Sequence, residues 1–220
     1  MLHYAPQNIR YTQTLAEINF FLIIMIKAII FDFGGIFNIR DSLKIFWQDN
    51  ADTLKVDPEK AFAISLPLWR KARIGNIDSE IFWEKLGACA KMSPENFKKY
   101  FIEYTGYREE MLEYIKKNLK GKYKLAILSN QIKTWIEPIL KEKKFEEVFD
   151  VIITSYNTGF AKPDIRIYKK AIQALGVKAQ ECIYIEDKPR NVGPAEALGM
   201  KVILFQSYDQ CINDLNNLLI

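Results

Sequence analysis

The chain has 220 residues, of which 49% are hydrophobic and 26% charged, with only 10 glycines and 8 prolines. This composition predicts a folded globular protein and excludes collagen-like, low-complexity and intrinsically disordered chains. The formal net charge is +4, but the surplus lysines lie in short scattered runs, which predicts solvated surfaces and no nucleic-acid partner.

Few residues of this chain could support histidine or thiol chemistry. The single histidine is His3, close to the N-terminus. The three cysteines, Cys89, Cys182 and Cys211, are far apart and lack C-x-x-C spacing. This predicts neither a disulfide framework nor a zinc site, and it favours a reducing, cytoplasmic location. Any catalysis is therefore expected to use carboxylates, lysine, hydroxyl groups and a metal ion.

Residues 1–19 carry little pattern, and an apolar run then extends from Phe20 to Phe31. The run is too short to span a bilayer, and it lacks the basic region and small-residue cleavage site of a signal peptide. We therefore expect no membrane association. Met25 directly precedes a strand pattern, so the core is expected to start at Met25. Residues 1–24 are then expected to be a dispensable extension or a start-site artefact. A genuine appended strand or helix is the alternative.

Short apolar runs that each end in polar residues are typical of buried strands in a parallel sheet. They cover residues 26–31, 123–128, 149–153, 182–185 and 202–205. Helical patterns lie between them, and one is expected to begin after Asp164 and to end at Gly176. This alternation predicts an α/β fold, a Rossmann-like parallel sheet with helices on both faces.

A long stretch without strand patterns interrupts this alternation over residues 39–107. Its aromatic residues recur at helical spacing, and turn signals at Asp57, Gly75 and Ser93 divide it into about four helices. These aromatic residues are expected to form a core rather than a ligand surface. The sequence thus predicts a Rossmann-like core of residues 25–38 and 108–220, with an inserted all-helical domain at 39–107.

Polar residues follow four of the strand patterns. Asp32 follows the first, Ser129 the second and the pair Glu186-Asp187 the fourth, while Lys162 lies in the loop after the third. Ligands of open parallel sheets bind at the carboxyl ends of the strands. An isolated aspartate at a strand end is often only a turn or cap residue. A carboxylate, a hydroxyl, an ammonium and an acid pair at four strand ends instead predict an active site.

The segments around these residues resemble the four motifs of the haloacid dehalogenase-like hydrolase superfamily, in the order that the family has. They read KAIIFDFGGIF, LAILSN, GFAKPD and CIYIEDKPRNVGPAEALGM, and the resemblance extends over residues 26–206. The helical insert lies where the capped members of the family carry a cap domain. Its segment GNIDSEIFWEKL resembles a cap stretch of the subgroup that includes sugar-phosphate phosphatases.

The resemblance implies a phosphate site. Asp32 would be the nucleophile that attacks phosphorus and forms an aspartyl-phosphate. Ser129 would donate its hydroxyl to a phosphoryl oxygen, helped by the Asn130 backbone N–H at the start of the next helix. Lys162 would be a compact positive charge that neutralises both the phosphate and Asp32.

The resemblance also implies a magnesium site. Asp187 would bind Mg²⁺ directly, and Glu186 would do so directly or through water. Asp32 and the Gly34 backbone carbonyl would complete the protein ligands. Asn191 is expected to support the loop rather than to perform chemistry.

The first motif departs from the family pattern at one position. Phosphatases of this family usually read D-x-D there, and the second aspartate acts as general acid and base, whereas this chain has Gly34. Three interpretations remain open: a phosphatase whose proton transfer comes from water or the cap, a catalytically weak or inactive binding or regulatory relative, and a 2-haloacid dehalogenase. General acid–base help is worth about 10² to 10⁴ in rate, so Gly34 also predicts a preference for phosphates with weakly basic leaving groups.

We favour a Mg²⁺-dependent phosphatase that acts on a small phosphorylated metabolite, a sugar phosphate or a similar compound, as a monomer or homodimer. A dehalogenase needs no Mg²⁺, and a purely structural relative has no reason to keep Asp32, Lys162 and Asp187 together. Replacing Gly34 by Asp is expected to raise the turnover of alkyl phosphates. Trp69, Arg70 and Arg73 of the insert could face the substrate, although the two arginines are expected to be ordinary solvated charges.

Overall fold

A five-stranded parallel sheet forms the centre of the protein in the computed structural model, which describes residues 25–219. The strand order is β3-β2-β1-β4-β5. The strands are β1 (Ala28–Phe31), β2 (Lys124–Ser129), β3 (Val151–Thr154), β4 (Cys182–Glu186) and β5 (Lys201–Leu204). They coincide with the apolar runs of the sequence to within two residues, so the predicted sheet is confirmed. The expectation for residues 1–24 lies outside the described residues.

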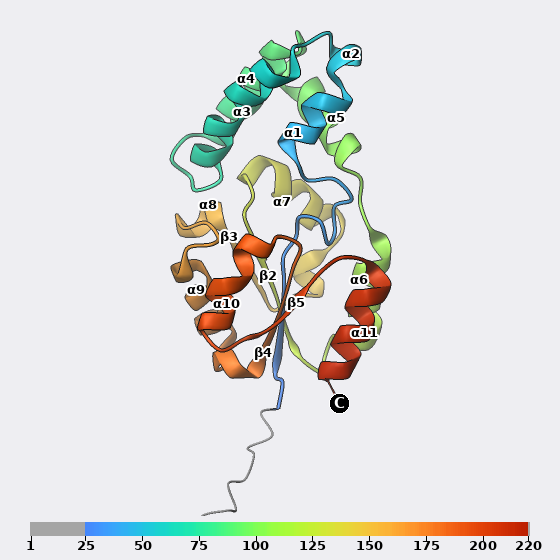
Figure 1. The fold of residues 1–220 in the computed structure, drawn as a ribbon, viewed down its shortest axis with the longest axis vertical. Helices are drawn as coiled ribbons and strands as arrows, with labels where there is room; N and C mark the ends of the chain where they lie inside the picture. Colours follow the sequence, from blue (N-terminus) through green and yellow to red (C-terminus); the bar gives the residue numbers. More distant parts are fainter. Residues whose placement is uncertain (1–24, 220) are drawn as a thin grey trace, which may run out of the picture.

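Helices cover both faces of the sheet (Figure 1). Successive residues of β1 point to opposite faces, so Ile29 and Phe31 pack in one hydrophobic cluster and Ile30 in another. The first cluster includes residues of α6 (Glu109–Asn118), α7 (Lys133–Glu142) and α11 (Tyr208–Leu218). The second includes residues of α9 (Ile165–Leu175) and α10 (Val192–Ala197). Short turns of helix complete this part: η1 (Phe145–Glu147), α8 (Ser155–Thr158), η2 (Ala179–Glu181) and η3 (Pro189–Asn191).

The ends of α9 follow the sequence prediction. The Asp164 carboxylate accepts a hydrogen bond of 2.9 Å from the backbone N–H of Arg166 at the start of the helix. Gly176 ends the helix with φ +62°, a left-handed conformation that a glycine adopts without strain.

The segment between β1 and α6 is helical and lies beyond one end of the sheet (Figure 1). Its buried aromatic residues form one cluster that includes Phe46, Trp47, Phe82 and Phe97, which confirms their predicted role as a core. Trp135 of α7 belongs to the same cluster, so the helical segment packs against the sheet-bearing part at α7. The helices are α1 (Leu43–Asp49), α2 (Ala51–Leu54), α3 (Pro58–Ala72), α4 (Ser79–Cys89) and α5 (Pro94–Thr105).

The expected division of this segment was about four helices, and the segment contains five, one of them the four-residue α2. The extra break lies at Asn50, whose backbone N–H and side-chain amide both donate to the Phe46 carbonyl and end α1 there. Asparagine competes with helix continuation in this way because its side chain can satisfy nearby backbone groups. The predicted breaks before α3 and α5 are confirmed, with Asp57 and Ser93 as N-caps.

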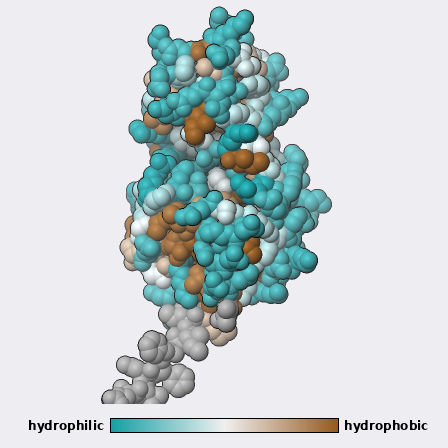
Figure 2. All heavy atoms as spheres, turned by 45° about the vertical axis from the view of Figure 1, so that its right-hand side comes forward, coloured by the Kyte–Doolittle hydropathy of each residue, from teal (hydrophilic) through white to brown (hydrophobic). Residues whose placement is uncertain are grey.

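The surface is mostly hydrophilic on the face that Figure 2 shows, and its apolar residues are confined to separate patches. No helix among residues 25–219 is both long enough and apolar enough to cross a membrane. Single exposed apolar side chains such as Ile45 and Ile64 are normal for a folded protein.

Candidate active site

A cavity of about 270 Å³ lies between the strand ends and the helical segment. Asp32, Ser129 and Lys162 line it from the side of the sheet. Phe62 and Trp69 line it from α3. The structure therefore brings together strand-end residues that are far apart in the sequence.

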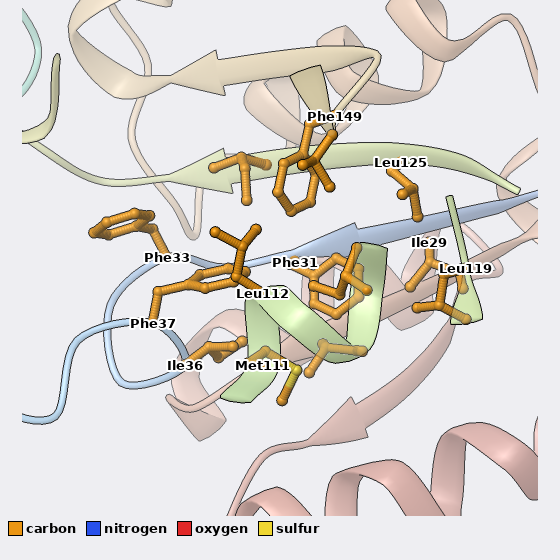
Figure 3. Packing of buried hydrophobic residues seen from close by; sticks show 14 of the residues in the cluster. Ile29, Phe31, Phe33, Ile36, Phe37, Met111, Leu112, Leu119, Leu125 and Phe149 are labelled. Carbon is orange, nitrogen blue, oxygen red and sulfur yellow. The ribbon is translucent and has the colours of Figure 1, made fainter. Parts of the chain in front are cut away.

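Asp32 is held at the end of β1 by its neighbours. Its backbone N–H continues the sheet ladder by donating to the Ile185 carbonyl at 2.8 Å. The following loop is anchored by Phe33 and Phe37, which are fully buried (Figure 3). The Phe37 ring packs edge-on against Phe145 with a centroid separation of 5.1 Å. Burial of these rings fixes the direction in which the Asp32 carboxylate leaves the strand.

Lys162 lies between two buried carboxylates. Its ammonium is 2.8 Å from Asp32 Oδ1 and 2.7 Å from Glu186 Oε2, and it donates to the Tyr184 hydroxyl at 3.0 Å. The Tyr184 hydroxyl in turn donates to Glu186. Ionised groups are retained in a protein interior only when they are paired and hydrogen-bonded, as they are here.

Asn130 fixes the backbone of Lys162. Its side-chain oxygen accepts the Lys162 N–H at 2.8 Å, and its amide donates to the Lys162 carbonyl at 2.9 Å. The helix after β2 begins only at Lys133, with Ile132 as N-cap, so Asn130 precedes the first helical turn. The proposed contact of its backbone N–H with phosphate stays a prediction, while the side chain positions the lysine.

The acidic residues of the site have shifted pKa values. Burial raises the pKa of Asp32 well above its usual range, although Lys162 opposes this. Burial also acts to raise the pKa of Glu186, but Lys162 and Tyr184 outweigh it and lower the value to about 2. Burial raises the pKa of Asp187 to about 6. Because the pKa values of Asp32 and Asp187 are raised, an added cation would stabilise the ionised forms of both carboxylates.

The acidic cluster fits a hard divalent cation. Carboxylate oxygens of Asp32, Glu186 and Asp187 lie within 4.8 Å of one another. The Oδ1 atom of Asp187 is buried and has no hydrogen-bond partner among the described residues, so it is free to bind an ion. Both Glu186 oxygens are already used, because Oε2 accepts from Lys162 and Oε1 accepts the Lys188 N–H at 3.0 Å. The ligand role of the Gly34 carbonyl stays a prediction.

Gly35 makes room for this cluster. Its φ is +72°, and a Cβ atom there would overlap the Asp187 carboxylate. Glycine is therefore required twice at this position, for the backbone conformation and for the close approach of Asp187.

Ser129 offers an unused hydroxyl to the cavity. Its Oγ is buried, lines the cavity and has no hydrogen-bond partner within residues 25–219. Gln131 Oε1 and Asn191 Oδ1 are also buried and unpaired among the described residues, and both residues line the cavity. Buried polar atoms are nearly always paired, so these atoms point to a polar ligand in the cavity.

Sequence reasoning missed an ion pair beside Gly34. A Cβ atom at Gly34 would lie 2.7 Å from Asp41 Oδ2, so the Asp41 carboxylate fills the place of the absent side chain. Lys188 forms an ion pair with Asp41 and lies 3.7 Å from Asp187 Oδ2. The signals in the sequence were weak, because Asp41 only precedes the N-cap Ser42 and Lys188 only follows the acid pair.

Two of the three candidate residues of the insert line the cavity. Trp69 and Arg73 do so, whereas Arg70 is exposed and does not. The expectation that Arg73 is an ordinary solvated charge is wrong, since it is half-buried. Arg73 is the C-cap residue after the last residue of α3, Ala72, so helical periodicity no longer predicts where its side chain points.

Comparison with known proteins gives a family match over most of the chain. A family model described as haloacid dehalogenase-like hydrolase matches residues 29–205. The sesquiterpene phosphatase astK of Aspergillus oryzae is 26% identical over 177 residues, which are 79% of this chain and 87% of that protein. The drimenol cyclase drtB of Aspergillus calidoustus is 24% identical over 88% of this chain, which spans only 37% of that longer protein.

The fold also matches solved structures. A haloacid dehalogenase family enzyme of Bacteroides thetaiotaomicron, solved in complex with magnesium and inorganic phosphate, superposes with a TM-score of 0.69. It is 20% identical, and the match covers 83% of this chain and 96% of that one. At this identity the likeness shows the fold alone.

Proposed function

Because the chain belongs to the haloacid dehalogenase-like hydrolase family, we propose that it is a Mg²⁺-dependent phosphatase of a small phosphorylated metabolite. The observation that carries this proposal is the buried cluster in which Lys162 bridges Asp32 and Glu186 beside the free carboxylate oxygen of Asp187. The name of the Aspergillus oryzae relative and the phosphate complex of the Bacteroides enzyme support a phosphate substrate.

The arrangement suits a two-step transfer through Asp32. In the first step the Asp32 carboxylate attacks phosphorus, an aspartyl-phosphate forms, and the bond to the leaving oxygen breaks. In the second step water attacks phosphorus, releases inorganic phosphate and restores Asp32. Lys162 neutralises charge on the phosphoryl oxygens, and the unpaired Ser129 hydroxyl donates a hydrogen bond to one of them.

Asp32, Asp187 and the Gly34 carbonyl would hold Mg²⁺, with Glu186 acting through water because its own oxygens are occupied. When bound, Mg²⁺ would neutralise the approaching phosphate, which otherwise repels the Asp32 carboxylate. Asp187 keeps one oxygen free for this purpose, and Gly35 allows it to lie close to the loop.

The Asp41–Lys188 pair would take over part of the proton transfer that an aspartate at position 34 usually performs in this family. The Asp41 carboxylate lines the cavity together with Asp32, so it can accept a proton from the attacking water. Glycine at position 34 has no side chain that could protonate the leaving oxygen, so the preference for weakly basic leaving groups is retained.

We also propose the division into a core of residues 25–38 and 108–220 and a cap at 39–107, with the substrate between them. The cavity of about 270 Å³ is close to the lower end of ligand pockets, roughly 300 Å³, which suits a small metabolite. A cytoplasmic location is supported by the three free cysteines.

The test of this function is hydrolysis of p-nitrophenyl phosphate with and without Mg²⁺. We expect turnover that requires Mg²⁺, and a kcat/KM for this aryl ester that exceeds that for glycerol 1-phosphate by about 10² to 10⁴. Equal rates on the two esters would show that a side chain protonates the leaving oxygen. Chloride release from 2-chloropropionate without Mg²⁺, and no phosphate release, would favour a dehalogenase instead.

The position of Asp41 leads us to expect slower turnover for Gly34→Asp, in place of the gain expected from the sequence. The new Cβ would lie 2.7 Å from Asp41 Oδ2 and would displace Asp41 from Lys188. We expect kcat/KM for alkyl phosphates to fall by about 10²-fold, as for other misplacements of about 1 Å in active sites. The double variant Gly34→Asp/Asp41→Ala removes the obstruction and should recover much of this loss. Faster alkyl phosphate turnover by Gly34→Asp alone would contradict this interpretation.

A further inference from the structure

We infer that Arg73 and Arg190 form a second anion-binding site in the cavity, so the substrate is a small phosphate ester that carries another acidic group. This inference rests on the proposed phosphatase function, because it assigns the first phosphate to Asp32, Ser129 and Lys162.

The two arginines reach the cavity from different parts of the fold. Arg73 caps the end of α3 in the helical segment, and Arg190 lies in η3, just after β4. Both line the same cavity as Asp32. A ligand that fills the cavity from the strand ends to α3 would therefore meet both guanidinium groups.

Neither guanidinium has a protein partner within residues 25–219. No ion pair or side-chain hydrogen bond joins Arg73 or Arg190 to a described residue, and Arg73 Nε is buried and unpaired. Burial and the nearby Arg190 and Arg70 lower the pKa of Arg73, and none of these causes is an acid. The lysines that line the cavity differ, because Lys44, Lys162 and Lys188 are each paired with a carboxylate.

Arg73 is half-buried and Arg190 is exposed at the mouth of the same cavity. Arg190 acts on Arg73 as a like charge, and two like charges this close repel each other unless an anion joins them. A guanidinium presents a planar fork of donors that matches the oxygens of a carboxylate or a phosphate. In the proposed function, Lys162, the Ser129 hydroxyl and Mg²⁺ would bind the reacting phosphate. Arg73 and Arg190 are therefore available to bind a second acidic group of the substrate.

The apolar residues that line the cavity indicate what kind of carbon skeleton joins the two acidic groups of the substrate. Phe62, Leu66 and Trp69 of α3 present an apolar wall to the cavity. Such a wall suits the carbon skeleton of a small substrate on the side of α3. The substrate class is thus a phosphate ester with a carboxylate or second phosphate at the other end of its carbon skeleton.

The test uses matched probes, phenyl phosphate and its 3- and 4-carboxy derivatives, which differ only in the added carboxylate. Binding is measured by calorimetry with Mg²⁺ on the full chain carrying Asp32→Asn, so that no probe is turned over. We expect at least one carboxylated probe to bind about tenfold or more tightly than phenyl phosphate, as expected for a charge-assisted hydrogen bond. Arg73→Met and Arg190→Met, each added to this variant, should reduce that preference towards one.

Arg70→Met is the matched control, because Arg70 lies on the same helix but does not line the cavity. It should keep most of the preference. Equal binding of all three probes, or a preference that survives both Arg73→Met and Arg190→Met, would overturn the inference. An equal loss for all three probes in these variants would also overturn it, because the arginines would then hold the reacting phosphate. Binding without hydrolysis by the unsubstituted chain would instead contradict the phosphatase function and leave the anion site standing.

Discussion

Replacing Asp32 by Asn is expected to reduce phosphate ester hydrolysis by about 10⁴-fold or more while the protein remains folded. The substitution keeps the shape of the side chain and removes the attacking carboxylate. Lys162 retains Glu186 as an ionic partner at 2.7 Å, so the buried cation is not left unpaired. The measurement is kcat with p-nitrophenyl phosphate, together with thermal unfolding to confirm that the fold survives.

The matched control is Asp209→Asn, since Asp209 is an exposed aspartate in the first turn of α11, away from the cavity. It should leave kcat within a factor of about two, as for most surface substitutions. Near-normal turnover by Asp32→Asn would show that phosphorus is attacked directly by water and that no covalent step is needed.

Lys162→Met is expected to have the largest effect on stability of any single change at the site. It leaves the Asp32 and Glu186 carboxylates buried without the cation that lies 2.8 and 2.7 Å from them. Removing one partner of a buried ion pair typically costs about 3–5 kcal/mol of unfolding free energy. Methionine has a similar length, so the loss reports the charge rather than a cavity. Hydrolysis should fall as well, because the phosphoryl charge loses its counterion.

The control for this variant is Lys143→Met, which removes the cation of a pair with Glu109 at 2.5 Å on the surface. Solvent screens that pair, so the expected change is only about 0–1 kcal/mol. Urea unfolding of both variants checks the comparison. Similar midpoints for the two variants would mean that the buried carboxylates take up protons at little cost, and that Lys162 is not what keeps them ionised.

Local pattern was sufficient to predict the elements of the fold. The strands are short apolar runs buried on both faces, and the ends of α9 were readable from Asp164 and Gly176, because a cap is a contact between neighbours in sequence. The break at Asn50 escaped prediction because the apolar residues Leu43, Trp47 and Leu54 keep a helical spacing across it.

The candidate site was predictable only in part. The strand-end rule places Asp32, Ser129 and Glu186 at one edge of the sheet, because all strands are parallel. No comparable rule predicts contacts between loops that are distant in the sequence. Asp41 and Lys188 are 147 positions apart, and the sequence around neither residue indicates that they form a pair.

The covalent role of Asp32 is tested most directly by trapping the phosphorylated enzyme. A reaction with p-nitrophenyl phosphate and Mg²⁺ is quenched within one turnover, reduced with borohydride and analysed by peptide mass spectrometry. An aspartyl-phosphate is reduced to homoserine, so we predict homoserine at position 32, absent when Mg²⁺ or substrate is omitted. Homoserine at another position would contradict the mechanism. Turnover without any reducible phosphoenzyme, under conditions where hydrolysis of the phosphoenzyme is the slow step, would also contradict it.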